Sequence, residues 1–567
     1  MSHFALIGED LVISRYKTER PRSKGSNKYI VDSKFDFVNI RGFQKMIVDI
    51  LHDIRIWTLL ALLSGVYIYI QNRRRRPPFP VLNTHANDFL GRKANQDYAT
   101  NASALITTGL AAHPTTPFAL ALPNAYKTIL PASLSNFVKS NRDLDHRELV
   151  RQDFYAGYPG FEAQDVLHAS GDMLLDIIKT KLGQNDSVMP VLNEKLDSAL
   201  RVHWGEEREW RMLNWHADTT VIIACAASSV FVGPEKCEDE EWLKLVQEYV
   251  MAYFSAVGEL HAYPAWSRRI IQRFFSPNAS ACRRHVVRAR QIMRDVLADR
   301  KRRVEEAKAE GRDIPVWNDA LAWAQAAPGG KEAEAGDLQL SLAMAAMFTT
   351  SELFRQVLID VASHPDVIAP LREESRKLIA KHGISVAATN GMVLMDSVLK
   401  ESQRRSAAAG MYFSLNSMDR KEELTCRIVA LERVALKDVK LPTGHTLPRG
   451  THIMVDSTSL FSPAHYSGPD SFVSDRFLRK REAGDKFGQF VQSGPDYSVF
   501  GGGRHICPGR FFAANELKMA MAHVLDKYDI RVKEGYVSKP LEMGVYKVVD
   551  PMMKFEVRRR ERDECVL

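Results

Sequence analysis

A chain of 567 residues with 45% apolar and 26% charged residues has the composition of a globular protein with a large core, which excludes a disordered, collagen-like or polytopic membrane protein. The net charge of +8, from 77 Lys and Arg against 69 Asp and Glu, favours contact with anionic lipid or an acidic partner protein; without a DNA-reading motif, no nucleic-acid partner is expected. The six cysteines lie far apart without a CxxC pair, which fits a reducing compartment facing the cytosol.

The first predicted element is a single membrane-spanning helix. Between Arg55 and Arg73 lie seventeen consecutive uncharged residues, just enough to cross a bilayer once. A buried core helix is the alternative, but four consecutive arginines end the segment abruptly and place the C-terminal bulk in the cytosol. We therefore expect a polar arm of unassigned function at 1–45, either disordered or an erroneous extension of the gene product, an anchor with its basic stop-transfer sequence at 46–76, a proline-rich linker at 77–83 and one large domain at 84–567.

Helical periodicity dominates the large domain. Apolar residues recur at spacings of three and four in Leu167–Arg201, Trp242–Leu260 and Ala281–Lys308, which predicts helices there. The last of these stretches is densely basic. Such a run is usually a solvated helix face, and a docking surface is the alternative.

A long central helix is predicted to begin at Asp337, as its N-cap, and to end near Ser363, where a His-Pro pair stops it. At 1.5 Å per residue it would be roughly 40 Å long, enough to cross the domain. Ser363 and Asp366 match a capping box for the next helix.

The periodicity changes after a further helix predicted at Met392–Arg405. Val434–Leu441 and Thr451–Thr458 are separated by turn residues and predict a small β-hairpin region. After Gly509 a final apolar helix is expected to about Tyr528, followed by extended segments. No repeat or low-complexity linker divides the domain, so the predicted fold class is mainly α with a small β component.

The sharpest local signal is a glycine-rich loop with one cysteine, FGGGRHICPGR over residues 500–510, directly before the final helix. Three successive glycines allow the backbone to approach a flat, bulky group, and Cys507 lies where amide groups and a helix N-terminus would stabilise an anionic sulfur. A phosphate-binding loop is the rival interpretation, but no Gly-Lys-Ser/Thr follows. An inert buried cysteine would leave the glycines unexplained, so the loop is predicted to present a thiolate.

This loop resembles the haem-binding signature of the cytochrome P-450 superfamily. It matches the signature at Phe500, Gly503, Cys507 and Gly509. The resemblance implies a cytochrome P-450 fold that binds haem b, with Cys507 as the axial thiolate ligand of the iron. His505 stands where the family usually has Arg, with Arg504 one position away, and either side chain can donate to a haem propionate.

Two further segments resemble the same family. Glu401 and Arg404 have the i, i+3 spacing of its Glu-x-x-Arg helix, and Arg476 corresponds to the third member of the associated network, although Ser474 replaces the usual proline. The resemblance implies that these three residues form a buried structural network rather than a catalytic one.

Residues 345–350, AAMFTT, resemble the oxygen-binding segment of the family's long helix. The resemblance implies catalytic hydroxyls at Thr349 and Thr350, which hold water and relay protons during oxygen activation. Phe348 replaces the customary acid, so the usual acid–alcohol pair is incomplete. Ordinary core packing is the alternative for the small residues of this segment.

The chain looks most like fungal microsomal members similar to ent-kaurene oxidases and other tailoring oxygenases of secondary metabolism. The resemblance implies a single-pass protein of the endoplasmic reticulum membrane with a cytosolic catalytic domain. It would oxidise a lipophilic small molecule of terpenoid, polyketide or alkaloid type with dioxygen and electrons from an NADPH-cytochrome P-450 reductase. A haem-dependent isomerase, dehydratase or rearrangement enzyme that needs no reductase is the first alternative, and a non-enzymatic haem or steroid carrier is the second.

Overall fold

The computed structural model describes residues 57–59, 62–66, 76–88, 91–122, 125–169, 173–183, 185–263, 265–406, 429–543, 546–561 and 567. The chain divides into two compact units, Met1–Ile70 and Gln71–Leu567. The predicted polar arm and most of the predicted membrane helix lie outside the described residues. Within the described ranges, no helix has both the length and the apolar character needed to span a bilayer.

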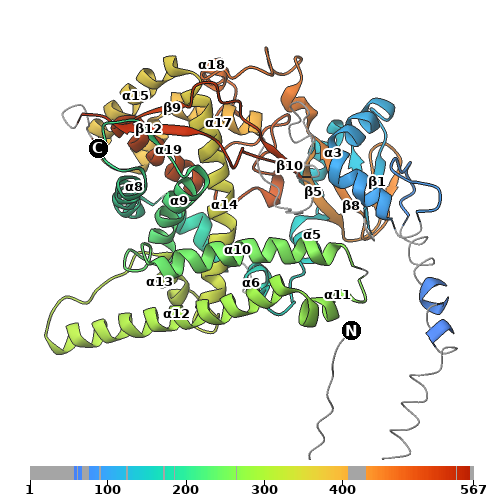
Figure 1. Cartoon of the computed structure of the whole chain (residues 1–567), viewed down its shortest axis with the longest axis horizontal. Helices are drawn as coiled ribbons and strands as arrows, with labels where there is room; N and C mark the ends of the chain where they lie inside the picture. Colours follow the sequence, from blue (N-terminus) through green and yellow to red (C-terminus); the bar gives the residue numbers. More distant parts are fainter. Residues whose placement is uncertain are drawn as a thin grey trace, which may run out of the picture. The chain divides into compact units, whose positions relative to one another are not determined.

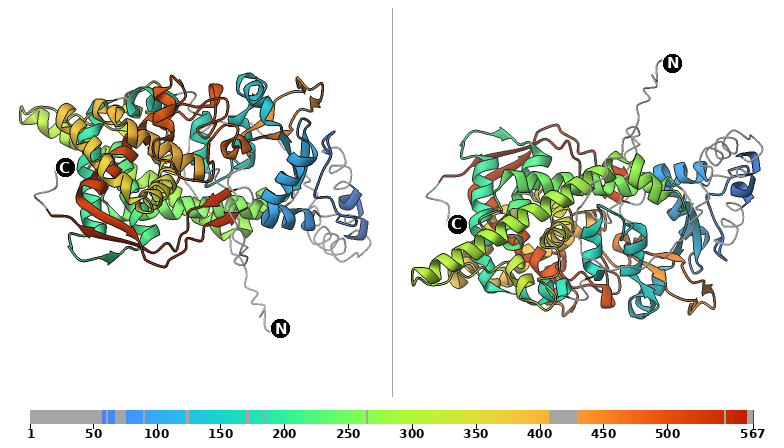
Figure 2. Two further views of the ribbon diagram at one scale, coloured as in Figure 1. Left: turned by 90° about the horizontal axis from the view of Figure 1, so that it is seen from above. Right: turned by 90° about the horizontal axis from the view of Figure 1, so that it is seen from below.

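The second unit is mainly helical, with a small β component, as predicted (Figure 1, Figure 2). Its α-helices are α3 (Arg92–Ala112), α4 (Ser135–Ser140), α5 (His146–Asp153), α6 (Glu162–Ala169), α7 (Met173–Ile177), α8 (Met189–Trp204), α9 (Trp215–Phe231), α10 (Glu240–His261), α11 (Arg268–Ile270), α12 (Pro277–Ala309), α13 (Ala320–Ala326), α14 (Ala335–Ala362), α15 (Ile368–His382), α16 (Val386–Gly391), α17 (Val393–Ser406), α18 (Arg476–Glu482) and α19 (Arg510–Lys527). Its strands are β1 (Phe118–Leu122), β2 (Ala125–Leu130), β3 (Leu144–Asp145), β4 (Arg211–Met212), β5 (Val429–Ala435), β6 (Val439–Lys440), β7 (Thr446–Leu447), β8 (His452–Asp456), β9 (Tyr528–Val532), β10 (Leu541–Met543), β11 (Tyr546–Val548) and β12 (Phe555–Arg559).

The largest sheet joins strands from both ends of the unit, in the order β1-β2-β8-β5-β3. The predicted hairpin region is confirmed, because β5 pairs with β8 in antiparallel fashion and β6 with β7. On its other edge β8 pairs in parallel with β2, from Lys127 opposite His452 to Leu130 opposite Val455. Periodicity could not reveal this pairing, because it joins segments more than three hundred residues apart in sequence.

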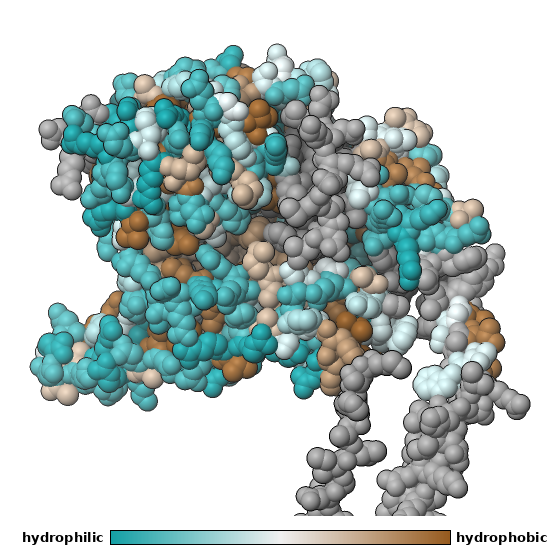
Figure 3. All heavy atoms as spheres, in the orientation of Figure 1, coloured by the Kyte–Doolittle hydropathy of each residue, from teal (hydrophilic) through white to brown (hydrophobic). Residues whose placement is uncertain are grey.

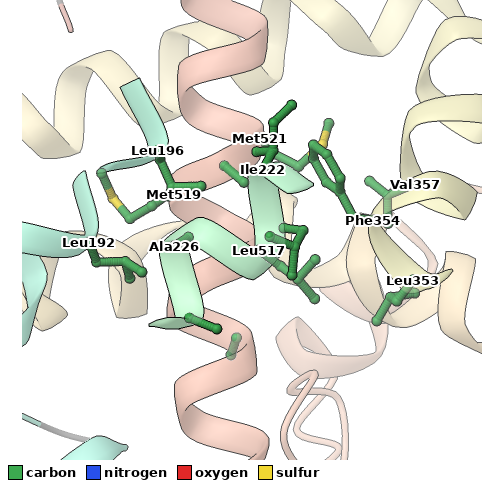
Figure 4. Close-up of a cluster of buried hydrophobic side chains, with 14 of the residues drawn as sticks. Leu192, Leu196, Ile222, Ala226, Leu353, Phe354, Val357, Leu517, Met519 and Met521 are labelled. Carbon is green, nitrogen blue, oxygen red and sulfur yellow. The ribbon is translucent and has the colours of Figure 1, made fainter. Parts of the chain in front are cut away.

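The core is built around α14 and α19, which are buried on most of their faces. Figure 4 shows side chains of α8, α9, α14 and α19 converging, with Leu196, Ile222, Phe354, Leu517 and Met521 among them. A second apolar cluster lies between α10, α12 and α14, and α10 runs beside α12 (Figure 1, Figure 2). A helix in the middle of the core, such as α14 or α19, is surrounded by other elements on most of its faces. By contrast, α12 has a hydrophilic outer side (Figure 3).

The helical prediction over Leu167–Arg201 is confirmed, and the structure divides the stretch into several helical elements. The described residues form α6, α7, a π-helical turn at Ile178–Leu182 and α8. The Asn185 side chain accepts a hydrogen bond from the Ser187 amide and caps a short 3-10 turn, and Pro190 lies in the first turn of α8. A capping asparagine followed by a proline near a helix start marks a new helix, and these local signals override the apolar spacing.

Two capping predictions around α14 are wrong. The helix begins at Ala335, and Asp337 in its first turn forms a bidentate ion pair with Arg290 of α12 at 2.8 and 2.7 Å. At the other end, a 3-10 turn at 365–367 precedes α15, and no side chain caps the start of either element, so the predicted capping box of Ser363 and Asp366 is not formed. The Asp337 carboxylate serves tertiary contact instead of the helix terminus.

The helices predicted at Trp242–Leu260, Ala281–Lys308 and Met392–Arg405 are confirmed as α10, α12 and α17, with ends shifted by a few residues. On α12, Arg288 pairs with Glu241, and Arg300 pairs with Asp319 at 2.7 Å. Much of the basic run is therefore neutralised by carboxylates of this chain, which agrees with a solvated helix face rather than a docking surface.

Candidate active site

The cysteine loop is a compact turn that leads into α19. The Cys507 amide donates to the Phe500 carbonyl oxygen at 2.8 Å, which closes the loop on itself. The Arg510 guanidinium donates to the Cys507 carbonyl oxygen at 2.8 Å, from the first residue of α19. Cys507 is half-buried and its thiol is free, so the loop presents an unpaired sulfur just before a helix N-terminus.

The structure shows steric and conformational constraints on the glycines of this loop that the sequence did not reveal. A Cβ atom on Gly503 would lie 2.0 Å from the carbonyl oxygen of Lys139, and one on Gly502 would lie 2.8 Å from the Lys139 side chain. Gly501 and Gly503 also adopt positive φ angles of 75° and 62°. The glycines are therefore required by the close approach of α4 and by the turn itself. A flat ligand is not needed to explain them.

The surroundings of the Cys507 sulfur have opposing effects on the pKa of its thiol. Burial raises the pKa of the thiol, while backbone hydrogen bonds from Gly509 and Arg510 and the charge of the Arg510 guanidinium oppose the shift. Burial is the largest of these effects, so the pKa of the Cys507 thiol lies above its ordinary value. A cation bound at the sulfur would favour the anion, because a coordinated thiol is deprotonated.

A buried ion-pair network contacts the chain that precedes the loop and is the one predicted from the Glu-x-x-Arg spacing. Glu401 receives both Nε and Nη2 of Arg404 at 2.9 Å, and Nε of Arg476 at 3.0 Å. Glu401 and Arg404 are completely buried. Arg404 also donates to the carbonyl oxygens of Leu460 and Pro469, both at 2.7 Å, so the predicted contacts are confirmed and they hold the irregular chain that precedes the loop.

Arg504 and His505, the two candidate donors to a haem propionate, have different surroundings in the structure. Arg504 is half-exposed and donates to the Asp145 carboxylate and the Arg142 carbonyl oxygen, both at 2.7 Å. The His505 side chain is buried, and its Nε2 lies 3.4 Å from the same carboxylate. Burial lowers the pKa of His505, although the hydrogen bond to Asp145 opposes this. Arg504 is thus engaged in a surface contact, whereas His505 faces the interior.

Sequence reasoning missed Arg433, the residue best suited to bind an anion here. It lies on β5, is 2% exposed, and donates to the carbonyl oxygens of Glu432 at 2.7 Å and of Gly502, in the cysteine loop, at 3.4 Å. Its Nε has no hydrogen-bond partner among the described residues. Burial lowers the pKa of Arg433 to about 10. A charged pair inside the apolar run Val429–Ala435 was the signal that could have revealed it.

The middle of α14 is open although the helix is otherwise buried. Ala345 is exposed, and Ala346, Phe348 and Thr349 are partly exposed. The Thr349 hydroxyl donates to the Ala345 carbonyl oxygen at 3.0 Å, while Thr350 is 4% exposed. Of the two predicted catalytic hydroxyls, the structure places Thr349 at the opening and Thr350 in the core.

These residues fit a flat group that carries a metal and carboxylates. Cys507 offers a sulfur with two supporting amides, and the unsatisfied Nε atoms of Arg433 and Arg510 are donors that carboxylates would satisfy. Ala346, at the opening of α14, and Phe500, in the cysteine loop, both pack against the large apolar core cluster. No group of three or more His, Cys, Asp or Glu within the described ranges could hold a metal ion by itself.

Comparisons with known proteins point in one direction. A family model described as "Cytochrome P450" matches residues 168–414 and 425–557. The chain is similar to cytochrome P450 monooxygenase adrA of Penicillium rubens, with 31% identity over 511 residues that cover 89% of this chain and 96% of the relative. It is also similar to dideacetyl fusicoccin A C-19 hydroxylase of Phomopsis amygdali, with 28% identity over 505 residues that cover 88% and 91%.

Solved structures show the same fold. The chain superposes on the haem domain of cytochrome P450DA with a TM-score of 0.60 and 15% identity, over 86% of this chain and 99% of that one. It superposes on the retinoic acid-bound cyanobacterial CYP120A1 with a TM-score of 0.59 and 14% identity, over 82% and 96%.

Proposed function

The chain belongs to the cytochrome P450 family and is a haem-thiolate monooxygenase, and from that premise we propose that it inserts oxygen into a lipophilic small molecule of fungal secondary metabolism. The observation that carries the proposal is a free, half-buried Cys507 supported by two amides at the start of α19. Relatives of about 30% identity include a hydroxylase whose name specifies a fusicoccin substrate. That name supports a small-molecule natural product as substrate, and we propose one of terpenoid, polyketide or alkaloid type.

In this proposal Cys507 would hold the iron of haem b through its sulfur. A bound haem-thiolate group supplies the activation of dioxygen for insertion into C–H bonds. The amides of Gly509 and Arg510 hold the sulfur in place and share its negative charge. Arg433 and His505 would bind the haem carboxylates, which the burial of their side chains supports, while Arg504 keeps Asp145 in place at the surface.

The distal side of the site is assigned to the opening of α14. The small side chains of Ala345 and Ala346 would leave room for the haem and substrate, and the Thr349 hydroxyl, which donates to the Ala345 carbonyl oxygen, would accept a hydrogen bond from a water. Phe348 carries no proton, so water, the substrate or the Thr349 hydroxyl itself must deliver protons. Thr350 is too deeply buried to act directly.

We also propose that the enzyme is a single-pass protein of the endoplasmic reticulum membrane with a cytosolic catalytic domain that receives electrons from an NADPH-cytochrome P-450 reductase. The seventeen uncharged residues 56–72 support the anchor. A second support is an apolar patch at and beside α11, visible in Figure 3, where aromatic side chains are 62 to 74% exposed near arginines. The α11 patch consists of Trp266, Ile270, Phe274 and Phe275.

Isotopically labelled dioxygen tests the reaction class. The purified holoenzyme with reductase and NADPH should transfer one labelled oxygen atom to a terpenoid or polyketide substrate. A product that forms without NADPH and carries no label would favour the isomerase alternative, for which the missing acid at Phe348 is the supporting observation. Inactivity with every redox partner, together with haem that binds no carbon monoxide, would favour a carrier.

Fractionation tests the membrane assignment. Removal of residues 1–76 should release most of the protein from the membrane pellet, and serine at Trp266, Phe274 and Phe275 should release the remainder. The full chain with only these three serines should stay in the pellet. Resistance of the truncated protein to alkaline carbonate extraction would contradict a single anchor.

A further inference from the structure

A second polar clamp holds the cysteine loop from both of its flanks. It is separate from the Glu401 network, although both are built on α17. Asp396 is 7% exposed, and its two carboxylate oxygens have different partners. Oδ2 accepts the backbone amide of Phe490 at 2.7 Å, and Oδ1 lies 2.6 Å from Nζ of Lys518.

The two partners of Asp396 lie on opposite sides of Cys507 in the chain. Phe490 precedes the loop, and its ring packs edge-to-face against Phe500 at 5.2 Å. The carbonyl oxygen of Phe500 in turn accepts a hydrogen bond from the Cys507 amide. Lys518 follows the loop on α19, the helix that starts beside Cys507, and it also donates to the Thr389 carbonyl oxygen at 3.0 Å. One carboxylate thus holds the entry to the loop and the helix that leaves it.

Lys400, one helical turn beyond Asp396, strengthens the hold on the entry side. Its Nζ donates to the carbonyl oxygens of Gln489 and Gln492, both at 2.7 Å, and lies 4.1 Å from the centre of the Tyr497 ring. The Tyr497 hydroxyl donates to the Lys400 carbonyl oxygen at 3.2 Å. The Lys400 ammonium group therefore contacts two carbonyl oxygens and one aromatic ring, all on the segment that leads to the loop.

We infer that Asp396 is a positioning residue that fixes the sulfur of Cys507, with Lys400 and Lys518 as its auxiliaries. The inference rests on the proposed role of Cys507 as haem ligand. A buried carboxylate shared between a main-chain amide and an ammonium group is stiff, because loss of either contact leaves a buried charge unpaired. The consequence is that the cysteine-ligated state persists only while the entry segment and α19 keep their mutual distance.

The chain offers a comparable control at the far end of α19. Asp526 is 2% exposed and has the same two kinds of partner, a basic side chain and a backbone amide: Nε of Arg376 on α15 at 2.6 Å and the Leu567 amide at 2.9 Å. Asp526→Asn therefore removes an equivalent buried charge without touching the cysteine loop. Asp396→Asn keeps the side-chain shape but loses the charge that faces Lys518.

The experiment compares both variants as holoenzymes. After reduction and addition of carbon monoxide, the red-shifted Soret band of thiolate ligation should decay at least about tenfold faster in Asp396→Asn than in Asp526→Asn at equal distance below each melting temperature. Hydrogen exchange at the amides of Phe490, Phe500 and Cys507 should accelerate only in Asp396→Asn. Equal decay and equal exchange in the two variants would overturn the inference.

The remaining outcomes are also decisive. If the wild type lacks the red-shifted band, the assignment of Cys507 fails, and the exchange data still test whether Asp396 holds the loop. If Asp396→Asn does not fold, Lys518→Met, which leaves the Phe490 amide contact in place, should show the same faster decay. The pair Asp396→Asn/Lys518→Met should recover the melting temperature while the band still decays fast; a wild-type decay rate in that pair would reduce Asp396 to a purely structural residue.

Discussion

The cysteine side and the α14 side of the site are held in different ways. On the cysteine side, Glu401 and Asp396 each join separate parts of the chain through buried charged contacts. In residues 345–350 of α14 no side chain is charged, and the Thr349 hydroxyl donates to a carbonyl oxygen of its own helix. Electrostatics fixes the position of the ligand, while packing alone shapes the reacting side. Changes on the first side should therefore damage the enzyme, and changes on the second should mainly alter its chemistry.

The largest effect is expected for the ligand itself. Cys507→Ala should lose the red-shifted Soret band of the reduced, carbon monoxide-bound protein completely, because no other sulfur occupies the loop. Cys282→Ala, which removes a fully buried thiol elsewhere, is the control and should keep the band. A Cys507→Ala protein that retains the band would refute the assignment.

Glu401→Ala should come next, with a loss of about 3–5 kcal/mol in the free energy of unfolding. The change leaves the buried guanidinium groups of Arg404 and Arg476 without their shared carboxylate. Chemical denaturation and haem content measure the effect. The exposed pair Arg288–Glu241 gives the contrast, because Glu241→Ala should cost less than about 1 kcal/mol. A stable, haem-replete but slow Glu401→Ala enzyme would contradict the structural role.

Acid should weaken the cysteine side through His146. Burial, reinforced by Arg433, lowers the pKa of His146 to about 4 from its ordinary value of 6.5. Between pH 4 and pH 6.5 the His146 imidazole is protonated in the unfolded chain but neutral in the folded protein. The free energy of unfolding is therefore highest above pH 6.5 and decreases as the pH falls toward 4. At pH 5 the free energy of unfolding should be lower by about 1–2 kcal/mol than above pH 6.5. Chemical denaturation at a series of pH values measures this decrease, which should be smaller in His146→Gln. An unchanged pH dependence in that variant would refute the assignment to His146.

The smallest effect on stability is expected at Thr349. Thr349→Val keeps the side-chain shape and should keep the thiolate spectrum. The ratio of hydrogen peroxide to product should rise roughly tenfold. Loss of a complete proton relay would raise this ratio further, but water still reaches the opening of α14. Thr350→Val is the matched control, since this hydroxyl lies in the core, and its ratio should stay near the wild-type value. Equal ratios in the two variants would make Thr349 a packing residue.

Local sequence signals predicted much of the site. The cysteine loop, the Glu401–Arg404 spacing and the Thr349 segment depend on contacts within a few residues, and their order along the chain is enough to relate them to one family. Arg433 was missed because Gly502, whose carbonyl oxygen it meets in the cysteine loop, lies far away in sequence, and only the folded chain brings the two together. The glycine run was found, but its cause, the approach of Lys139, was not.

The sequence by itself determined the fold class, the family and the residue that presents the sulfur, because periodicity and short motifs are properties of neighbouring residues. The tertiary structure decided which of two threonines is open, which of Arg504 and His505 faces the interior, and which carboxylate holds Lys518. Each of these depends on burial or on a partner contributed by a distant segment. Burial and long-range pairing arise only when helices such as α14, α17 and α19 pack together, so no local pattern records them.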